Sequence, residues 1–423
     1  MEKIISLAKR RGFVYQGSEI YGGLAGTWDY GPLGVSLKNN VKNIWWKQFV
    51  ESRTDMFGLD AAILMNPKVW EASGHVGGFS DPLVECAKCH KRFRSDHVEG
   101  NNCPECSGVL GEARQFDMMF KTNIGATEDP DSISYLRPET AQGIFVNFKN
   151  VVDSFSPKLP FGIGQIGKAF RNEIAPRDFI FRVRELEQME VEYFVRESDW
   201  ETYFEAWRRE IVHFTEVIGL PKNMVHEVEV EGDDRAHYSK RTIDFEFDFP
   251  FGQKELYGLA YRGDYDLTNH KLNYFDQEAN ERFVPHVIEP SLGVDRTILA
   301  LLTSAYTEEK LGDDVRVYLK LKPSVAPIIV AVSPLLKNKP ELVEKAQSVF
   351  ADLKREFGRV MFDDNGNIGK RYRRQDEIGT PFCVTIDFDS LDDDTVTVRS
   401  RDTAEQERMS IDKLGEYIAE KIK

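Results

Sequence analysis

The sequence predicts an α+β protein with a strand-rich central region and a smaller α/β unit at its C-terminal end. In the middle of the chain, segments rich in β-branched and aromatic residues are bounded by Pro and Gly, which is typical of strands. After Lys322 and Pro323, strand and helix patterns alternate instead. A chain of 423 residues fits two or three domains. We therefore expect one domain over residues 1–322 and a second over 323–423.

The first third of the chain predicts helices and a glycine-rich turn region. Residues 1–13 lack the long apolar run of a signal peptide and predict a short helix. Residues 19–34 are rich in Gly and aromatic side chains and predict buried turns. The spacing of apolar residues predicts a helix over 33–53. Residues 59–70 predict a strand that is halted near Pro67.

The central region predicts several strands and two helices. A clear amphipathic pattern predicts one helix from Ser198 to Gly219, and residues 283–306 predict a strand, a glycine turn and a second helix. The predicted strand segments are 132–148, 161–174, 179–195 and 241–260. In the C-terminal unit, a helix is predicted over 340–358, with Pro340 at its first turn, and another after Ser410.

Composition excludes some classes of protein. No run of about 18 apolar residues is present, so no membrane-spanning segment is expected and a cytoplasmic location is predicted. The formal net charge of −15 argues against a protein that coats nucleic acid nonspecifically, since neutralising phosphates requires Lys and Arg. A local basic surface remains compatible with that charge.

Residues 161–178 contain a G-x-G-x-x-G match and come within one residue of a P-loop, but neither loop is predicted here. Ala169 follows Lys168 where a P-loop requires Ser or Thr, and Pro176 comes too early for the helix that both loops need. We predict instead a strand over 163–174, a short loop, and a returning strand over 179–195. Alternation on the second strand puts Arg182, Arg184, Gln188, Glu190 and Glu192 on one face, which is either solvated or the floor of a polar site.

Four of the five cysteines form two C-x-x-C pairs. The pairs Cys86/Cys89 and Cys103/Cys106 lie in an insertion over about residues 82–115, and this spacing is a strong signal for a structural zinc site. A disulfide reading is disfavoured in a cytosolic chain. The fifth, Cys383, lies in an apolar stretch and is expected in the core.

Several motifs resemble a known enzyme class. "FRNE" at 170–173, followed by a loop and a returning strand, resembles motif 2 of class II aminoacyl-tRNA synthetases, and "GVDR" at 293–296 resembles motif 3. The predicted helix and strand between residues 33 and 67 are more loosely similar to motif 1. Five longer stretches are similar to the homodimeric glycyl-tRNA synthetase family: 28–34, 137–145, 181–194, 258–270 and 289–296.

This resemblance implies a class II catalytic domain built on an antiparallel sheet, with a zinc-ribbon-like insertion and a C-terminal anticodon-binding domain. It implies that ATP and glycine form a glycyl adenylate, that the glycyl group then passes to tRNA(Gly), that Mg²⁺ accompanies ATP, and that the chain is a homodimer. Two alternatives stay open: a noncatalytic nucleic-acid-binding or polymerase-accessory protein on the same scaffold, and a class II enzyme for another amino acid. An accessory protein is expected to lose the motif arginines, which are present here.

The resemblance also assigns residues to ATP. Arg171 is expected to hold the α-phosphate, while Arg296 holds the far end of a bent ATP and stacks on adenine opposite Phe181, because a guanidinium is always charged and bidentate. Glu255 and Glu173 are candidates for Mg²⁺ and adenine contacts. The full expected ATP set is Arg171, Asn172, Glu173, Phe181, Arg182, Val183, Arg184, Glu185, Leu186, Glu255, Leu256, Gly293, Val294, Asp295 and Arg296. The alternative for these side chains is surface ion pairing.

Glycine must be recognised through its ammonium, its carboxylate and the absence of room for a Cβ atom. The expected glycine set is Arg94, Glu139, Leu186, Glu187, Gln188, Met189, Glu190, Glu289, Pro290, Ser291, Leu292 and Gly293. Glu139 could instead start a helix after Pro138. Nothing smaller than glycine competes for such a pocket, so no editing domain is expected.

Basic residues around Tyr372 are candidates for tRNA contact, because single-stranded RNA favours cations next to an aromatic ring. These candidates are Lys370, Arg371, Arg373 and Arg374. A solvated helix face is the alternative.

Overall fold

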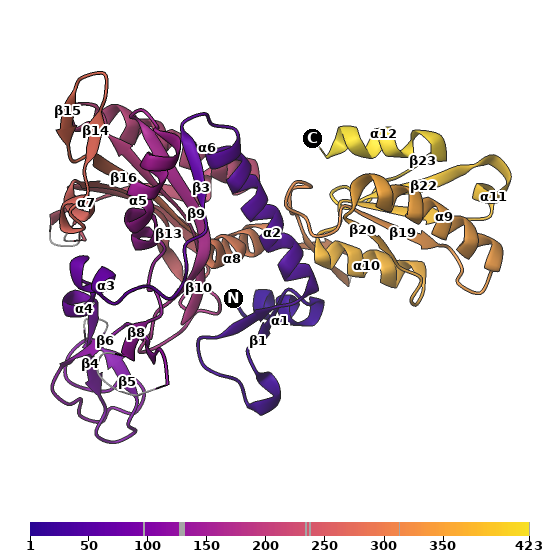
Figure 1. Ribbon diagram of the computed structural model, residues 1–423. Coiled ribbons are helices and arrows are strands. Elements are labelled where there is room, and N and C mark those ends of the chain that lie inside the picture. The colour runs from indigo at the N-terminus through magenta and orange to yellow at the C-terminus, as the bar shows by residue number, and fades with distance from the viewer. Residues whose placement is uncertain (96–97, 127–131, 233–234, 237, 313, 423) are drawn as a thin grey trace.

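The computed structural model describes residues 1–95, 98–126, 132–232, 235–236, 238–312 and 314–422. A seven-stranded sheet forms its centre (Figure 1), and neighbouring strands are antiparallel except for β3 and β9, which are parallel. In spatial order the strands are β11 (Val225–Val230), β12 (Arg241–Phe249), β13 (Gly252–Gly263), β16 (His286–Gly293), β10 (Glu185–Val195), β9 (Phe161–Phe170) and β3 (Met56–Leu59).

Helices cover the two faces of this sheet differently. On one face α2 (Pro32–Trp46), α6 (Trp200–Ile218) and α8 (Val294–Ala305) bury a large apolar core, in which Phe49 stacks between Trp45 and Trp207. On the other face α5 (Ala141–Phe155) packs Phe148 against Phe161 and Phe194. Beyond the α5 contact, this second face turns polar, and the candidate site lies there.

The cysteine-bearing insertion forms a three-stranded sheet in the order β5 (Arg92–Arg94), β4 (Ser80–Glu85) and β6 (Arg114–Asp117), drawn below the main sheet in Figure 1. Outside the insertion, residues 2–319 also contain the following smaller elements: α1 (Glu2–Arg11), β1 (Val14–Gln16), β2 (Trp28–Tyr30), a π-helical turn (Lys47–Glu51), α3 (Lys68–Ala72), α4 (His75–Gly78), β7 (Lys121–Asn123), β8 (Ile133–Tyr135), α7 (Tyr265–Asn269), β14 (Tyr274–Asp276), β15 (Glu281–Phe283), β17 (Tyr306–Leu311) and β18 (Asp314–Leu319).

The C-terminal segment forms a separate five-stranded sheet, to the right in Figure 1, with its own apolar core. Its strands, in spatial order, are β20 (Val360–Phe362), β19 (Val330–Pro334), β21 (Phe382–Ile386), β22 (Thr395–Ser400) and β23 (Gln406–Ser410), and its helices are α9 (Pro340–Phe357), α10 (Ile368–Ile378), α11 (Asp389–Asp393) and α12 (Ile411–Lys421). The helices predicted from Pro340 and after Ser410 are confirmed. The division of the chain at residue 322 and the insertion limits 82–115 stay predictions. Within the described ranges, no helix combines the length and apolarity needed to cross a bilayer.

Five sequence-based expectations need correction. The turns predicted over 19–34 are not buried throughout, since Tyr21 is 87% exposed. The strand predicted over 179–195 begins only at Glu185, since Asp178 and Phe179 adopt positive φ and turn the chain first. The strand predicted over 163–174 ends at Phe170. Most of 132–148 is not strand, because Ile144, Phe145 and Phe148 recur at helical spacing and bury one face of α5. Residues 59–70 give only the end of β3 and the start of α3.

Candidate active site

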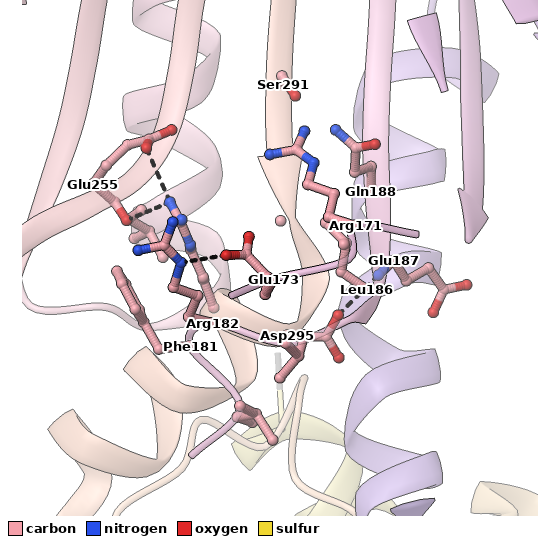
Figure 2. Close-up of a pocket in the computed structure, with 15 residues that line it drawn as sticks. Arg171, Glu173, Phe181, Arg182, Leu186, Glu187, Gln188, Glu255, Ser291 and Asp295 are labelled. Atoms are coloured by element: carbon pink, nitrogen blue, oxygen red, sulfur yellow. Dashed lines mark hydrogen bonds and ion pairs between the residues drawn. The ribbon is translucent and has the colours of Figure 1, made fainter. Parts of the chain in front are cut away.

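A cavity of about 320 Å³ opens at the polar end of the sheet, where β10, β13 and β16 meet the segment that follows β9. Its walls contain both arginines of the motifs noted above. The lining residues are Arg171, Glu173, Ile180, Phe181, Arg182, Val183, Leu186, Glu187, Gln188, Glu255, Leu256, Ser291, Gly293, Asp295 and Arg296. The fold thus brings residues far apart in the sequence into one hollow (Figure 2).

Arg296 lies in the first turn of α8 and points toward β13. Its Nη1 donates to the backbone carbonyl of Glu255 (2.9 Å) and lies 3.1 Å from the Glu255 carboxylate. Because Arg296 is so close, and Arg171 adds to its effect, the pKa of Glu255 is lowered. The Arg296 guanidinium also lies 4.4 Å from the centre of the Phe181 ring. The two groups expected to enclose adenine therefore contact each other here, and a base can enter between them only after one of them moves.

Arg171 follows the end of β9 and joins this cavity to a second one. Its Nε donates to the backbone carbonyl of Pro138 (3.0 Å), and its guanidinium lies 5.6 Å from the Phe79 ring centre. Figure 2 shows the guanidinium directed toward Ser291 and Gln188. The second cavity, of about 290 Å³, shares Arg171, Gln188, Glu255 and Ser291 with the first.

Arg182 is oriented by carboxylates at the mouth of the first cavity. Its Nε donates to Glu173 at 2.6 Å, and Glu173 is buried. Arg184 turns away from both cavities and donates to the backbone carbonyls of Glu173 and Ala25. Arg184 therefore connects the segment after motif 2 to the glycine-rich loop near residue 25, and this is a loop contact outside the lining of either cavity.

Several other expected ATP residues serve structural roles around the cavity. Asn172 donates its backbone N–H to Met118, and the Glu185 carboxylate pairs with Lys168. Val294 is fully buried in the large core. Val183, Leu186, Leu256 and Gly293 line the cavity as expected.

The Glu187 side chain does not join the other carboxylates expected to bind glycine. Lys38 (2.8 Å) and Lys42 (3.1 Å), both on α2, hold its carboxylate. These lysines lower the pKa of Glu187 despite its burial. Asp295 accepts the backbone N–H of Glu187 (2.8 Å) and the hydroxyl of Tyr30. Glu187 thus anchors β10 to α2, and Asp295 anchors α8 to β10 and to Tyr30.

An acidic niche, formed by Glu139, Glu190 and Glu289, lines the second cavity. Each of these three residues is at most 9% exposed. Glu190 accepts from Ser291 Oγ (2.8 Å) and from the Thr140 hydroxyl, and Glu289 accepts from Arg262 Nη1 (2.8 Å). The niche therefore combines buried negative charge with access to the cavity through Ser291.

The three carboxylates of the niche differ in their affinity for protons. Burial raises the pKa of Glu289 to about 8, although Arg262 opposes the shift. Burial and the neighbouring Glu139 also raise the pKa of Glu190. Burial acts on Glu139 as well, but the adjacent His75 and Arg262 hold its pKa well below the usual range. A ligand cation placed here would relieve repulsion among these acids.

Some residues that were expected to bind the substrate glycine lie outside both cavities, because strand alternation directs their side chains to the other face of the sheet. Met189 and Leu292 are fully buried in the core on the opposite face of the sheet, and Pro290 is buried opposite Leu259. Arg94 lies on β5 and pairs with Asp81 at 2.9 Å, outside the lining of either cavity.

Three polar residues around the niche, Arg262, Asp266 and Gln142, were not among the expected site residues. Arg262 is 1% exposed and pairs with both Asp266 and Glu289. Gln142 donates to Glu139 (3.1 Å) and Asp266 (3.0 Å). Gln142 lies within the stretch 137–145 and Arg262 within the stretch 258–270, both of which carried the resemblance, and that resemblance is the signal that could have found them.

The four clustered cysteines converge as their spacing predicts. All four Sγ atoms lie within 4.8 Å of one another, with Cys86 3.5 Å from Cys106 and Cys89 3.7 Å from Cys103. No disulfide joins these four. Tetrahedral zinc with Zn–S bonds of about 2.3 Å requires S–S separations of about 3.8 Å. The observed separations and the donor set therefore fit a metal held by four thiolates.

On α10, the candidate RNA contacts divide into two groups. Arg371 is 1% exposed and donates to the backbone carbonyls of Pro334, Asp364 and Gly366, so it holds the start of the helix and is not accessible to RNA. This corrects the expectation for Arg371. The other three are more exposed: Lys370, Arg373, which pairs with Asp314, and Arg374, which pairs with Asp363.

Comparisons with known proteins agree with this architecture. The family model described as "tRNA synthetase class II core domain (G, H, P, S and T)" matches residues 120–305, and the one described as "Anticodon binding domain" matches residues 329–421. The antiparallel sheet and the motif arginines that meet in one cavity are thus those of a class II tRNA synthetase core.

Comparison with individual curated proteins shows which family of class II synthetases the chain resembles. A glycine–tRNA ligase of Lachnospira eligens is 51% identical over all of this chain and 99% of its own length. One from Treponema denticola is 51% identical over all of this chain and 97% of its own. One from Bacillus cereus is 51% identical over all of this chain and 99% of its own. The chain belongs to the glycine–tRNA ligase family.

Proposed function

We propose that this chain joins glycine to tRNA(Gly) at the expense of ATP, through a glycyl-adenylate intermediate. The observation that carries the proposal is the pair of joined cavities. One has the cationic side chains that a polyphosphate needs, the other has the acids that an ammonium needs, and Arg171 lines both. In the first step, a glycine carboxylate oxygen bonds to the α-phosphorus of ATP while the bond to pyrophosphate breaks. In the second, the terminal ribose hydroxyl of tRNA takes the glycyl group and AMP leaves.

Charge positioning explains the first step. Phosphoryl transfer depends mainly on orientation and on neutralising charge that develops on phosphate oxygens. Arg171, at the junction of the cavities, is placed to hold the α-phosphate beside the amino acid carboxylate. Arg296 is placed to bind the triphosphate after releasing Glu255, with which it now pairs. Glu255 is then available as a ligand for the Mg²⁺ that accompanies ATP, and that ion would neutralise phosphate charge.

The acidic niche would bind the ammonium group of the amino acid. Glu139, Glu190 and Glu289 offer acceptors for an ammonium group, and Ser291 links the niche to the cavity of Arg171. Glycine has no side chain to grip, so discrimination rests on excluding any Cβ atom. Because smaller competitors do not exist, we propose that this chain does not hydrolyse mischarged alanyl-tRNA.

Three further proposals concern partners and metal. We propose that the C-terminal five-stranded unit contacts the anticodon region of tRNA through the exposed Lys370 and Arg373 of α10 and the half-buried Arg374 beside them. The four thiolates would hold a structural Zn²⁺, which stabilises an insertion too small for a large core of its own. The chain would act as a homodimer in the cytoplasm, joined through α2 and β3, which correspond to the motif 1 helix and strand.

The decisive experiment is ATP–pyrophosphate exchange measured separately with each of the twenty amino acids. Exchange that requires glycine, followed by transfer of labelled glycine to tRNA(Gly), supports the proposal. Exchange that another amino acid supports better would move the chain to a different class II specificity. Nucleic-acid binding without any exchange would favour the accessory protein, which both motif arginines in one cavity argue against.

A further inference from the structure

One carboxylate of the cysteine-bearing insertion lies beside an arginine that lines the candidate ATP cavity. Asp81 lies near the start of β4, and its Oδ2 is 2.9 Å from Nη1 of Arg94 and 3.7 Å from Nη2 of Arg182. Arg182 lines the cavity and also donates to Glu173. The Asp81 side chain is 15% exposed, so water screens these ion pairs only in part. Two guanidinium groups from distant parts of the chain thus share one carboxylate.

The cysteine turn determines where that carboxylate and Arg94 lie. Strands β4 and β5 form an antiparallel hairpin in which Leu83 lies opposite Arg94. Cys86 and Cys89 lie in the connection between the two strands. Because Asp81 is two residues before Leu83, it lies on the same face of β4. The turn that can hold a metal therefore sets the register that puts Arg94 beside Asp81.

Backbone hydrogen bonds join the base of the same insertion to motif 2. Met118 donates its N–H to the carbonyl of Phe79 (3.1 Å), and Asn172 donates its N–H to the carbonyl of Met118 (2.8 Å). The ring of Phe79 lies under the guanidinium of Arg171. These contacts hold the main chain of the insertion against motif 2, so the position of Asp81 relative to Arg182 follows from the fold.

We propose that Asp81 is a positioning residue for the ATP site, which keeps Arg182 directed into the cavity and offsets its repulsion from Arg94. This inference rests on the proposed function. A free arginine side chain samples many rotamers, and ordering it during substrate binding costs free energy. Glu173 on one side and Asp81 on the other order Arg182 before ATP arrives. Through Asp81 the insertion thus contributes to a site although none of the lining residues belongs to the insertion.

The test is Asp81→Asn, which removes the charge at nearly constant shape. We expect KM for ATP in glycine-dependent exchange to rise about three- to tenfold, the range between exposed and buried ion pairs. KM for glycine should change by less than about twofold, because the niche lies on the other side of Arg171. Asp81→Glu, which keeps the charge, should recover most of the affinity for ATP. If Asp81→Asn does not fold, Asp81→Ser removes the same charge with less bulk.

A matched control comes from the other end of the same strand. Glu85 pairs with Arg92 (3.0 Å) and lines neither cavity. Glu85→Gln should leave KM for ATP unchanged. Metal content and the melting temperature are measured for every variant, since a merely structural role would lower them without a selective change in KM. The inference fails if Asp81→Asn leaves KM for ATP unchanged, if Glu85→Gln raises it equally, or if Asp81→Glu gives no recovery. A wild-type chain without glycine-dependent exchange would instead overturn the proposed function.

Discussion

Replacing Glu190 by Gln tests the acidic niche most directly. The Glu190 side chain is 2% exposed, accepts from Ser291 Oγ at 2.8 Å, and lies on β10 directly opposite Ser291 on β16. Glu190→Gln keeps the shape of the side chain and removes its negative charge. If this carboxylate receives the glycine ammonium, the variant exchanges an ammonium–carboxylate ion pair for a hydrogen bond from the ammonium to an uncharged amide oxygen.

The expected magnitude follows from that exchange. A hydrogen bond to a charged group contributes about 1.5–3 kcal/mol. Since 1.4 kcal/mol corresponds to a factor of ten, KM for glycine should rise about 10- to 150-fold. KM for ATP should stay within about twofold of the wild-type value, because the ATP contacts of Arg171 and Arg296 are untouched. The folded state should tolerate the change, as burial and Glu139 already raise the pKa of Glu190 and disfavour its charge.

Glycine-dependent ATP–pyrophosphate exchange, with each substrate varied in turn, measures both constants. Glu229→Gln is the matched control. Glu229 lies on β11 of the same sheet, is half exposed and pairs with Arg241 at 2.9 Å. The Glu229→Gln variant should leave KM for glycine and KM for ATP unchanged. An unchanged KM for glycine in Glu190→Gln would refute the assignment of the niche, and so would an equal rise in both constants.

Three further predictions concern the ATP cavity, the proton balance of the niche and the cysteines. Arg296→Lys should raise KM for ATP about fivefold or more, since a lysine loses planar stacking and bidentate contact; titrating ATP in the exchange assay checks this, and an unchanged value would contradict it. Burial raises the pKa of Glu289 to about 8, so the folded state binds this proton more tightly than the unfolded state and wild-type stability falls as pH rises from about 5 to 8. Glu289→Gln cannot lose that proton, so its melting temperature relative to wild type should increase over this range, and a constant difference would be the contrary result. Removing metal with a chelator should speed proteolysis between residues 82 and 115 while the C-terminal unit stays resistant, as mass spectrometry of the fragments would show.

Local patterns in the sequence predicted much of the structure. Two C-x-x-C pairs indicated the thiolate cluster, because ligand spacing in such turns is a local property. Apolar residues at helical spacing, with Pro340 at the first turn, predicted α9 to within one residue. The motif resemblance also assigned Arg171 and Arg296 to one site, and the structure brings both into one cavity.

Other expectations failed where long-range packing decides. Alternation along β10 separates Glu187 from Glu190 in any strand, but it does not say which face α2 will cover. Because α2 packs on the face of β10 that carries Glu187, Lys38 and Lys42 form ion pairs with Glu187. Glu190 lies on the opposite face, in the niche. Similarly, a run of basic residues around Tyr372 looks uniform in the sequence. The fold of the C-terminal unit buries Arg371 in hydrogen bonds to the backbone carbonyls of Pro334, Asp364 and Gly366 and leaves Lys370 and Arg373 exposed.

The sequence by itself thus determined helices such as α9 and the cysteine cluster, because these depend on residue type and short-range spacing, while the motif resemblance singled out Arg171 and Arg296. Only the tertiary structure decided which carboxylates share the niche with Arg262, that Phe181 contacts Arg296, and that Asp81 links the insertion to Arg182. The physical reason is that charge pairing and burial act between groups a few ångströms apart in space, and strand register and helix packing set those distances.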